Sequence, residues 1–67
     1  MIKNKLSEIM GRKRINMAEL ARMAGLSHVA VFKIYHNQTK TIQLETIDKL
    51  CKALNCRIQD IFEQVND

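Results

Sequence analysis

Apolar residues recur at three- and four-residue steps through most of the chain, and short polar stretches separate the runs. This spacing places apolar side chains on one face of an α-helix, so it predicts a succession of amphipathic helices. The predicted helices cover residues 2–13, 17–24, 28–35, 44–54 and 58–65. No proline interrupts them, and the chain contains only two glycines, which argues against a turn-rich β fold. We therefore expect an all-α fold, a compact five-helix bundle.

A very short connection joins the second and third predicted helices. Asn16 and Glu19 have the spacing of a capping box, in which each side chain bonds a free backbone N–H at the helix start. Gly25 ends that helix because glycine readily adopts the left-handed conformation, and Ser27 is a good cap for the next one. Two short helices joined by about three residues must cross steeply. The pattern therefore predicts a helix-turn-helix over residues 17–35.

The third predicted helix has a buried and an exposed face. At about 100° per residue, Val31, Ile34 and Tyr35 lie on the inner side. Exposed residues in its first turns, where a groove-reading helix meets bases, are His28, Val29, Phe32 and Lys33. Lysine and histidine donate hydrogen bonds to bases or phosphate, and valine contacts the methyl group of thymine. In the alternative interpretation, His28 and Lys33 are ordinary solvated residues, and Phe32 packs on the first helix or on a partner.

Basic residues are concentrated in the first part of the chain. Residues 1–40 contain eight Lys or Arg and two Glu, a formal charge of +6, whereas residues 41–67 contain three basic and five acidic residues, a charge of −2. A polyanion would therefore dock on the first part, although a basic excess alone fits a solubilising surface equally well. We expect the 67 residues to form a single domain, residues 1–67, which is too small for a deep active-site cavity.

The sequence indicates neither an enzyme nor a metal site. His28 and His36 lie on a helix start and in a loop, without a nucleophile or paired carboxylates nearby. Cys51 and Cys56 lack the further ligands of a zinc site, and a disulfide between residues five apart requires a break in the helix. We expect no cofactor and two reduced thiols. Because no signal peptide or membrane-spanning run is present, we expect a cytoplasmic protein without a membrane partner.

A resemblance to the Cro and repressor type of helix-turn-helix (XRE-like) is carried by the segment AELARMAGLSHVAVFKIYHNQTK. The matching features are Leu20, Ala21, Gly25, Leu26, Ser27, Val31 and Ile34, followed by the segments LETIDKLCKALN and IQDIF. The resemblance implies a bundle of the lambda-repressor-like type with the third helix in the major groove. It also implies phosphate contacts from the helix starts and from the loop after the third helix, at Asn16, Met17, Ser27, Asn37, Gln38, Thr39 and Lys40. This chain departs from the family at Met17, where relatives often carry glutamine, and at Asn37, a common glycine position.

The function that follows from this resemblance is sequence-specific binding of a double-stranded DNA operator by a transcriptional regulator, expected to be a repressor. The alternative is a protein-interaction module, such as an antitoxin or a partner that sequesters another regulator. Single-stranded nucleic acid is a weaker candidate, because one tyrosine and two phenylalanines provide no stacking platform. No small-molecule ligand is expected.

A homodimer is expected, because one short helix reads too few base pairs to select an operator in a genome. The partner surface would come from the apolar residues of the last predicted helix, unless these residues simply close the core. They are Ile58, Ile61, Phe62 and Val65.

Overall fold

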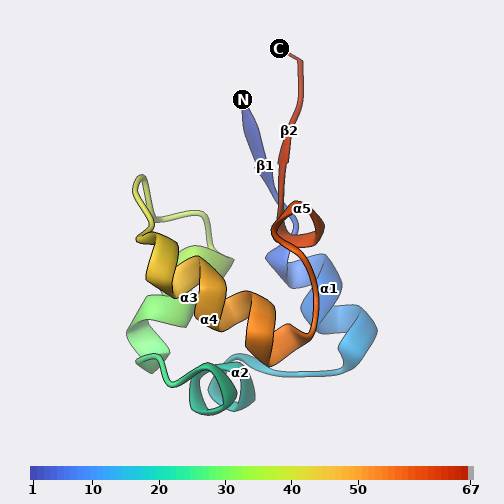
Figure 1. Ribbon diagram of the computed structural model, residues 1–67. Helices are drawn as coiled ribbons and strands as arrows, with labels where there is room; N and C mark the ends of the chain where they lie inside the picture. The colour runs from blue at the N-terminus through green and yellow to red at the C-terminus, as the bar shows by residue number, and fades with distance from the viewer. Residues whose placement is uncertain (67) are drawn as a thin grey trace.

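The computed structural model describes residues 1–66, which form five helices and a two-stranded sheet. The helices are α1 (Leu6–Lys13), α2 (Met17–Ala24), α3 (His28–Tyr35), α4 (Leu44–Leu54) and α5 (Ile58–Ile61). The strands are β1 (Ile2–Asn4) and β2 (Phe62–Gln64). The helices gather around one core, and the sheet projects from them with both chain ends side by side at its tip (Figure 1).

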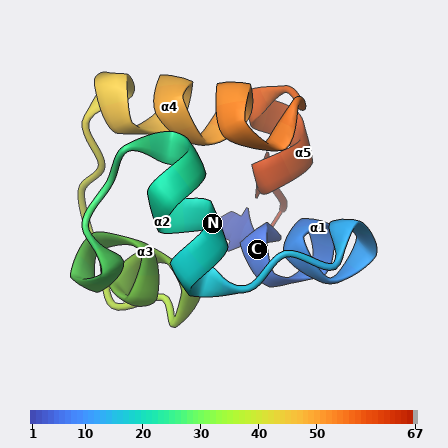
Figure 2. The same ribbon diagram turned by 90° about the horizontal axis from the view of Figure 1, so that it is seen from below.

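The helix-turn-helix prediction is confirmed in its local detail. Asn16 Oδ1 accepts from the backbone N–H of Glu19 at 2.8 Å, and Glu19 Oε1 accepts from that of Asn16 at 3.1 Å, so the capping box of α2 is complete. Gly25 ends α2 in the left-handed conformation, with φ 68°. The turn brings α3 across α2, and α4 packs on the other side of α2 (Figure 2).

The core is formed by apolar side chains from one face of each helix. Burial of these apolar side chains is the main contribution that holds five short helices together. The buried residues are Leu6, Ile9, Met10, Leu20, Ala21, Ala24, Val31, Ile34, Leu50, Leu54 and Ile61. Leu44 was expected on the inner face of the fourth helix, but it is 81% exposed at the first residue of α4.

The all-α prediction is wrong at both ends of the chain. Residues 2–4 were expected to begin the first helix and residues 62–65 to end the last, but Ile2–Asn4 and Phe62–Gln64 pair as antiparallel strands, with Lys3 opposite Glu63. Lys5 continues the link by donating its backbone N–H to the carbonyl of Ile61 at 2.6 Å. Ile2 is consequently 62% exposed and lies outside the core.

Helices α1 to α4 each end near a residue with positive φ. This residue directly follows α1, α2 and α4, at Arg14, Gly25 and Asn55, and it follows α3 one residue later, at Asn37 after the cap residue His36. At each end two backbone N–H groups bond carbonyls of the last turn, which satisfies acceptors that the helix leaves free. Asn37, at the position where the family commonly carries glycine, holds the left-handed conformation, with φ 59°.

The left-handed residue Asn55 is the break that lies between the two cysteines. It folds the chain back so that the backbone N–H of Cys56 donates to the carbonyl of Cys51 at 3.0 Å. Both cysteines are free thiols and half-buried. Burial raises the pKa of Cys51 and of Cys56, and nearby Asp60 raises both further.

The thiols should therefore alkylate slowly in the folded protein. Their pKa values lie above the ordinary 9.0, so the reactive thiolate is scarcer at neutral pH than in the unfolded chain, and the rate should still be rising with pH at pH 9. Because the folded state holds these protons more tightly than the unfolded state, their contribution to stability is complete below pH 9 and is lost as the pH rises through the folded-state pKa values. Mass spectrometry of iodoacetamide adducts measures the alkylation rate of the two cysteines, with the chain unfolded in urea as the control. Equal rates in both states would contradict it.

Candidate nucleic-acid interface

Helix α3 is fixed by a cap at its first turn and by its buried face. Ser27 Oγ accepts from the backbone N–H of Ala30 at 3.0 Å, as the sequence predicted. Val31 and Ile34 are buried in the core, and Tyr35 is half-buried beside them. The opposite side of α3 carries the exposed residues His28, Val29, Phe32 and Lys33. The predicted division of α3 into a buried and an exposed face is confirmed.

The exposed side of α3 is partly apolar. Val29 is 62% exposed and Phe32 is 42% exposed. The ring of Phe32 lies 4.4 Å from that of His36, and Tyr35 contacts the other edge of the same imidazole at 5.0 Å between centroids. Phe32 thus packs along its own helix, and its remaining surface faces outward with Val29.

The start of α2 offers donors beside α3. Asn16 uses its side-chain oxygen for the cap of α2, which leaves its amide hydrogens to donate outward. Met17 is half-buried and packs against the core, so its side chain supplies no phosphate contact. At that position only the backbone N–H groups of the first turn of α2 can hold an anion.

The loop after α3 holds the remaining predicted phosphate ligands. Asn37 and Gln38 are exposed, Thr39 is half-buried, and Lys40 is exposed. Asn37 Oδ1 accepts from Asn4 Nδ2 at 3.0 Å, which orients this side chain and leaves its amide hydrogens as donors. Gln38 and Lys40 have side chains without such a contact in the described part of the chain.

A surface hollow between α3 and the start of α4 was not predicted. Val29 and Lys33 line one wall of it, and Thr39, Thr41 and Gln43 line the other. Gln43 is the N-cap residue of α4, where free backbone N–H groups gather. The polar run from His36 to Thr41 was the only signal for this feature in the sequence, and it did not show which of these side chains would turn toward α3.

The lysines on α3 and in the loop after it form no ion pair in the described part of the chain, whereas carboxylates on α4 and β2 do. Glu45 and Asp48 form ion pairs with Lys49 and Lys52 on α4, at 3.4 and 3.0 Å. Glu63 on β2 pairs with Lys5 at 3.8 Å. Within residues 1–66, Lys33 and Lys40 form no ion pair and no side-chain hydrogen bond, which leaves both cations for an external anion.

Comparison with known proteins identifies the family of this helix-turn-helix domain. The sequence model of the Cro/C1-type HTH DNA-binding domain matches residues 5–67. The chain belongs to this family. The Cro/C1-type domain also aligns with an uncharacterised HTH-type transcriptional regulator, YozG, of Bacillus subtilis (strain 168). The two are 27% identical over 59 residues, which cover 88% of this chain and 70% of the relative. The family match therefore makes this chain a DNA-binding domain.

The described part of the Cro/C1-type domain contains neither a candidate metal-binding cluster nor a helix able to span a membrane. Residues 1–66 contain no group of three or more His, Cys, Asp or Glu placed to hold a metal ion. Over the same range, none of the helices combines the length and apolar character needed to cross a bilayer.

The apolar residues expected at a dimer surface divide into two groups. Ile61 is 0% exposed and belongs to the core, so that part of the expectation is wrong. Ile58 is 49% exposed, and Phe62 and Val65 are half-buried. Ile2, which was not expected there, lines a surface groove together with Ile58 and Phe62.

Proposed function

We propose that the protein binds a specific double-stranded DNA operator by inserting α3 into the major groove, and that it represses transcription by occupying this site. The observation that carries the proposal is the exposed side of α3. Its first two turns present His28, Val29 and Lys33 free of intramolecular polar partners in the described part of the chain. The major groove admits one helix, and its base edges carry a distinct donor and acceptor pattern for each base pair.

Each exposed side chain of α3 has a proposed role. Lys33 donates to guanine O6 and N7, His28 donates to a base acceptor, and Val29 contacts a thymine methyl group. Phe32 extends this apolar contact. The proposed phosphate ligands lie on both sides of α3. Side chains supply them at Asn16, Ser27, Asn37, Gln38, Thr39 and Lys40, and the backbone supplies them at Met17.

Residues 1–67 are proposed to act as one DNA-binding domain in the cytoplasm, without catalysis and without a small-molecule effector. The amount of protein, a protein partner or proteolysis would then set operator occupancy.

The proposed function is tested by selecting bound sequences from a random pool of duplex DNA. A shared motif among the retained duplexes, together with weaker retention of the same sequences as single strands, supports operator binding. If no duplex is retained over the starting pool, the function fails. A protein-interaction role would then be the better account.

Substitutions of Lys33 and His28 should change which sequences are preferred. Lys33→Ala and His28→Ala should each cost about 1–3 kcal/mol at particular base pairs, because the lost donors face base edges. The measurement is a repeat of the selection with each variant, with Lys52→Ala on α4 as the control. A uniform loss over all sequences would reassign both residues to phosphate contacts.

A homodimer on a pseudo-palindromic site is proposed, because one short helix reads too few base pairs to select an operator in a genome. The candidate surface is the groove lined by Ile2, Ile58 and Phe62, together with Val65, which directly follows β2. Sedimentation with and without a palindromic duplex should show two chains per duplex. One chain per duplex on sites that lack symmetry would contradict the dimer.

A further inference from the structure

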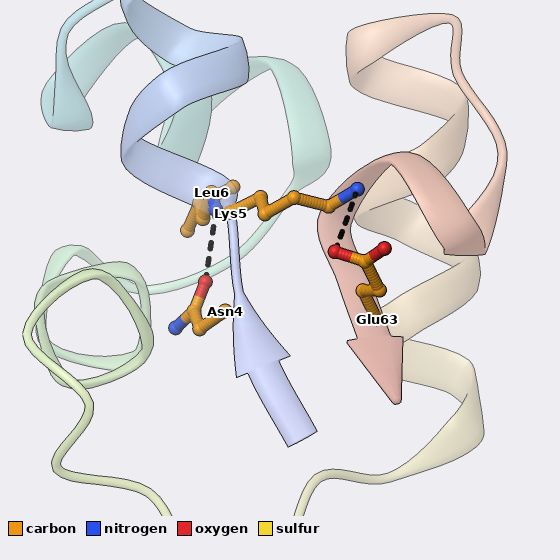
Figure 3. Close-up of polar contacts among 4 residues, drawn as sticks. All are labelled: Asn4, Lys5, Leu6 and Glu63. Atoms are coloured by element: carbon orange, nitrogen blue, oxygen red, sulfur yellow. Dashed lines mark hydrogen bonds and ion pairs between the residues drawn. The ribbon is translucent and has the colours of Figure 1, made fainter. Parts of the chain in front are cut away.

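The side chain of Asn4 bonds the start of α1, two residues away, and the end of α3, 30 and 33 residues away. Its Oδ1 accepts from the backbone N–H of Leu6 at 2.9 Å, at the start of α1 (Figure 3). Its Nδ2 donates to the carbonyl of Ile34 at 2.7 Å and to Oδ1 of Asn37 at 3.0 Å. An amide nitrogen has two hydrogens, so both donors of Asn4 are committed to α3 and the residue that ends it.

The two acceptors lie where α3 gives way to the loop. The carbonyl of Ile34 also accepts from the backbone N–H of Asn37 at 3.2 Å, the bond that closes the last turn of α3. Asn37 holds positive φ and begins the loop that contains Gln38 and Lys40. Asn4 therefore holds both the carboxyl-terminal end of α3 and the first residue of the loop.

The backbone of Asn4 is itself held in place. Asn4 is paired with Phe62 in the sheet, and the next residue bonds the carbonyl of Ile61. Lys5 adds an ion pair to Glu63 on β2 (Figure 3). The side chain of Asn4 thus reaches α3 from β1, a strand that is held in place by β2 near the other end of the chain.

We propose that Asn4 is a positioning residue for DNA binding. It sets the position of the end of α3 relative to the phosphate-contacting loop, and it does so through Ile34 and Asn37 without touching DNA. The match to the Cro/C1-type family begins at residue 5, so this contact comes from a part of the chain that the family match does not include. The proposal rests on the proposed function, since it assumes that α3 and this loop face DNA.

Asn4→Asp tests the contact selectively. The carboxylate retains an acceptor for Leu6, so the start of α1 is preserved, but it has no donor for Ile34 and Asn37. Affinity for a duplex selected with the wild-type protein should fall about five- to thirtyfold, the effect of losing two hydrogen bonds. Amide exchange at Asn37 and Gln38 in the free protein should become faster.

Asn55→Ala is the matched control for a general loss of stability. It removes the side-chain amide that lets asparagine tolerate positive φ, at the end of α4 rather than α3. It should lower the melting temperature and leave both the affinity for the duplex and exchange at Asn37 unchanged. A double-variant cycle with Asn37→Gly, which keeps the positive φ and removes the acceptor, should show that the two substitutions are not independent.

Each outcome decides the proposal. Folded Asn4→Asp protein that binds the duplex as tightly as the wild type overturns it, as does a similar loss of affinity in Asn55→Ala. If Asn4→Asp does not fold, Asn4→Ser replaces it, because the hydroxyl can accept from Leu6 but is too short to reach Ile34. If neither variant folds, Asn4 serves the fold alone and the proposal is wrong. Failure of the proposed function would appear earlier, as a wild-type protein that retains no duplex.

Discussion

Val31→Asp should abolish the folded state. Val31 is 0% exposed at the centre of the buried face of α3, and no buried polar or charged residue among residues 1–66 could pair with a carboxylate there. An uncompensated buried charge costs about 3–5 kcal/mol, and the lost burial of valine adds about 1.5–3 kcal/mol. The total stability of a chain of this length is on the order of 3–10 kcal/mol, so the variant should be largely unfolded. Circular dichroism should show loss of helix at 25 °C.

Val29→Asp is the matched control, with the same substitution two residues earlier on the same helix. Val29 is 62% exposed, so the carboxylate stays in water and the helix signal should remain. The two variants separate two reasons for losing DNA binding, since the first lacks the fold and the second places a negative charge on the proposed DNA face. A folded Val31→Asp protein with wild-type helix content would show that the core is not packed as described.

The parts of this fold that could be predicted are those whose causes lie within a few residues. The capping box of Asn16 and Glu19, the cap at Ser27 and the left-handed ends at Gly25 and Asn37 are each set by local side-chain chemistry. The exposed face of α3 was predictable for the same reason, because helical periodicity places each side chain relative to Val31.

The terminal sheet could not be predicted, because its cause is a partner strand at the other end of the chain. Ile2 lies four residues before Leu6 and so satisfies the helical spacing, although it pairs opposite Gln64 in the structure. A three-residue strand is also too short to show an alternating pattern. The bonds of Asn4 to Ile34 and Asn37 depend on this pairing, and they were missed with it.

Affinity for DNA should fall steeply as salt is raised. Each cation that neutralises a phosphate releases a counterion, so the logarithm of the binding constant falls with the logarithm of salt with a slope of about −0.9 per contact. Roughly four to six contacts per chain would reduce the affinity about 10²- to 10³-fold between 50 and 200 mM salt. The unpaired Lys33 and Lys40 are the leading candidates for these phosphate contacts. The basic residues 12–14 at the end of α1 carry further positive charge.

Lys40→Gln and Lys52→Gln form a matched pair for this prediction, because both remove one positive charge from an exposed side chain. Lys40 lies in the loop after α3, and its loss should reduce the magnitude of the slope by about one and weaken all sequences alike. Lys52 lies in the last turn of α4 and pairs with Asp48 at 3.0 Å, so its loss should leave the slope unchanged. Titrations of a selected duplex by fluorescence anisotropy at several salt concentrations give both slopes. A wild-type affinity that does not depend on salt would exclude phosphate contacts and, with them, DNA binding by this face.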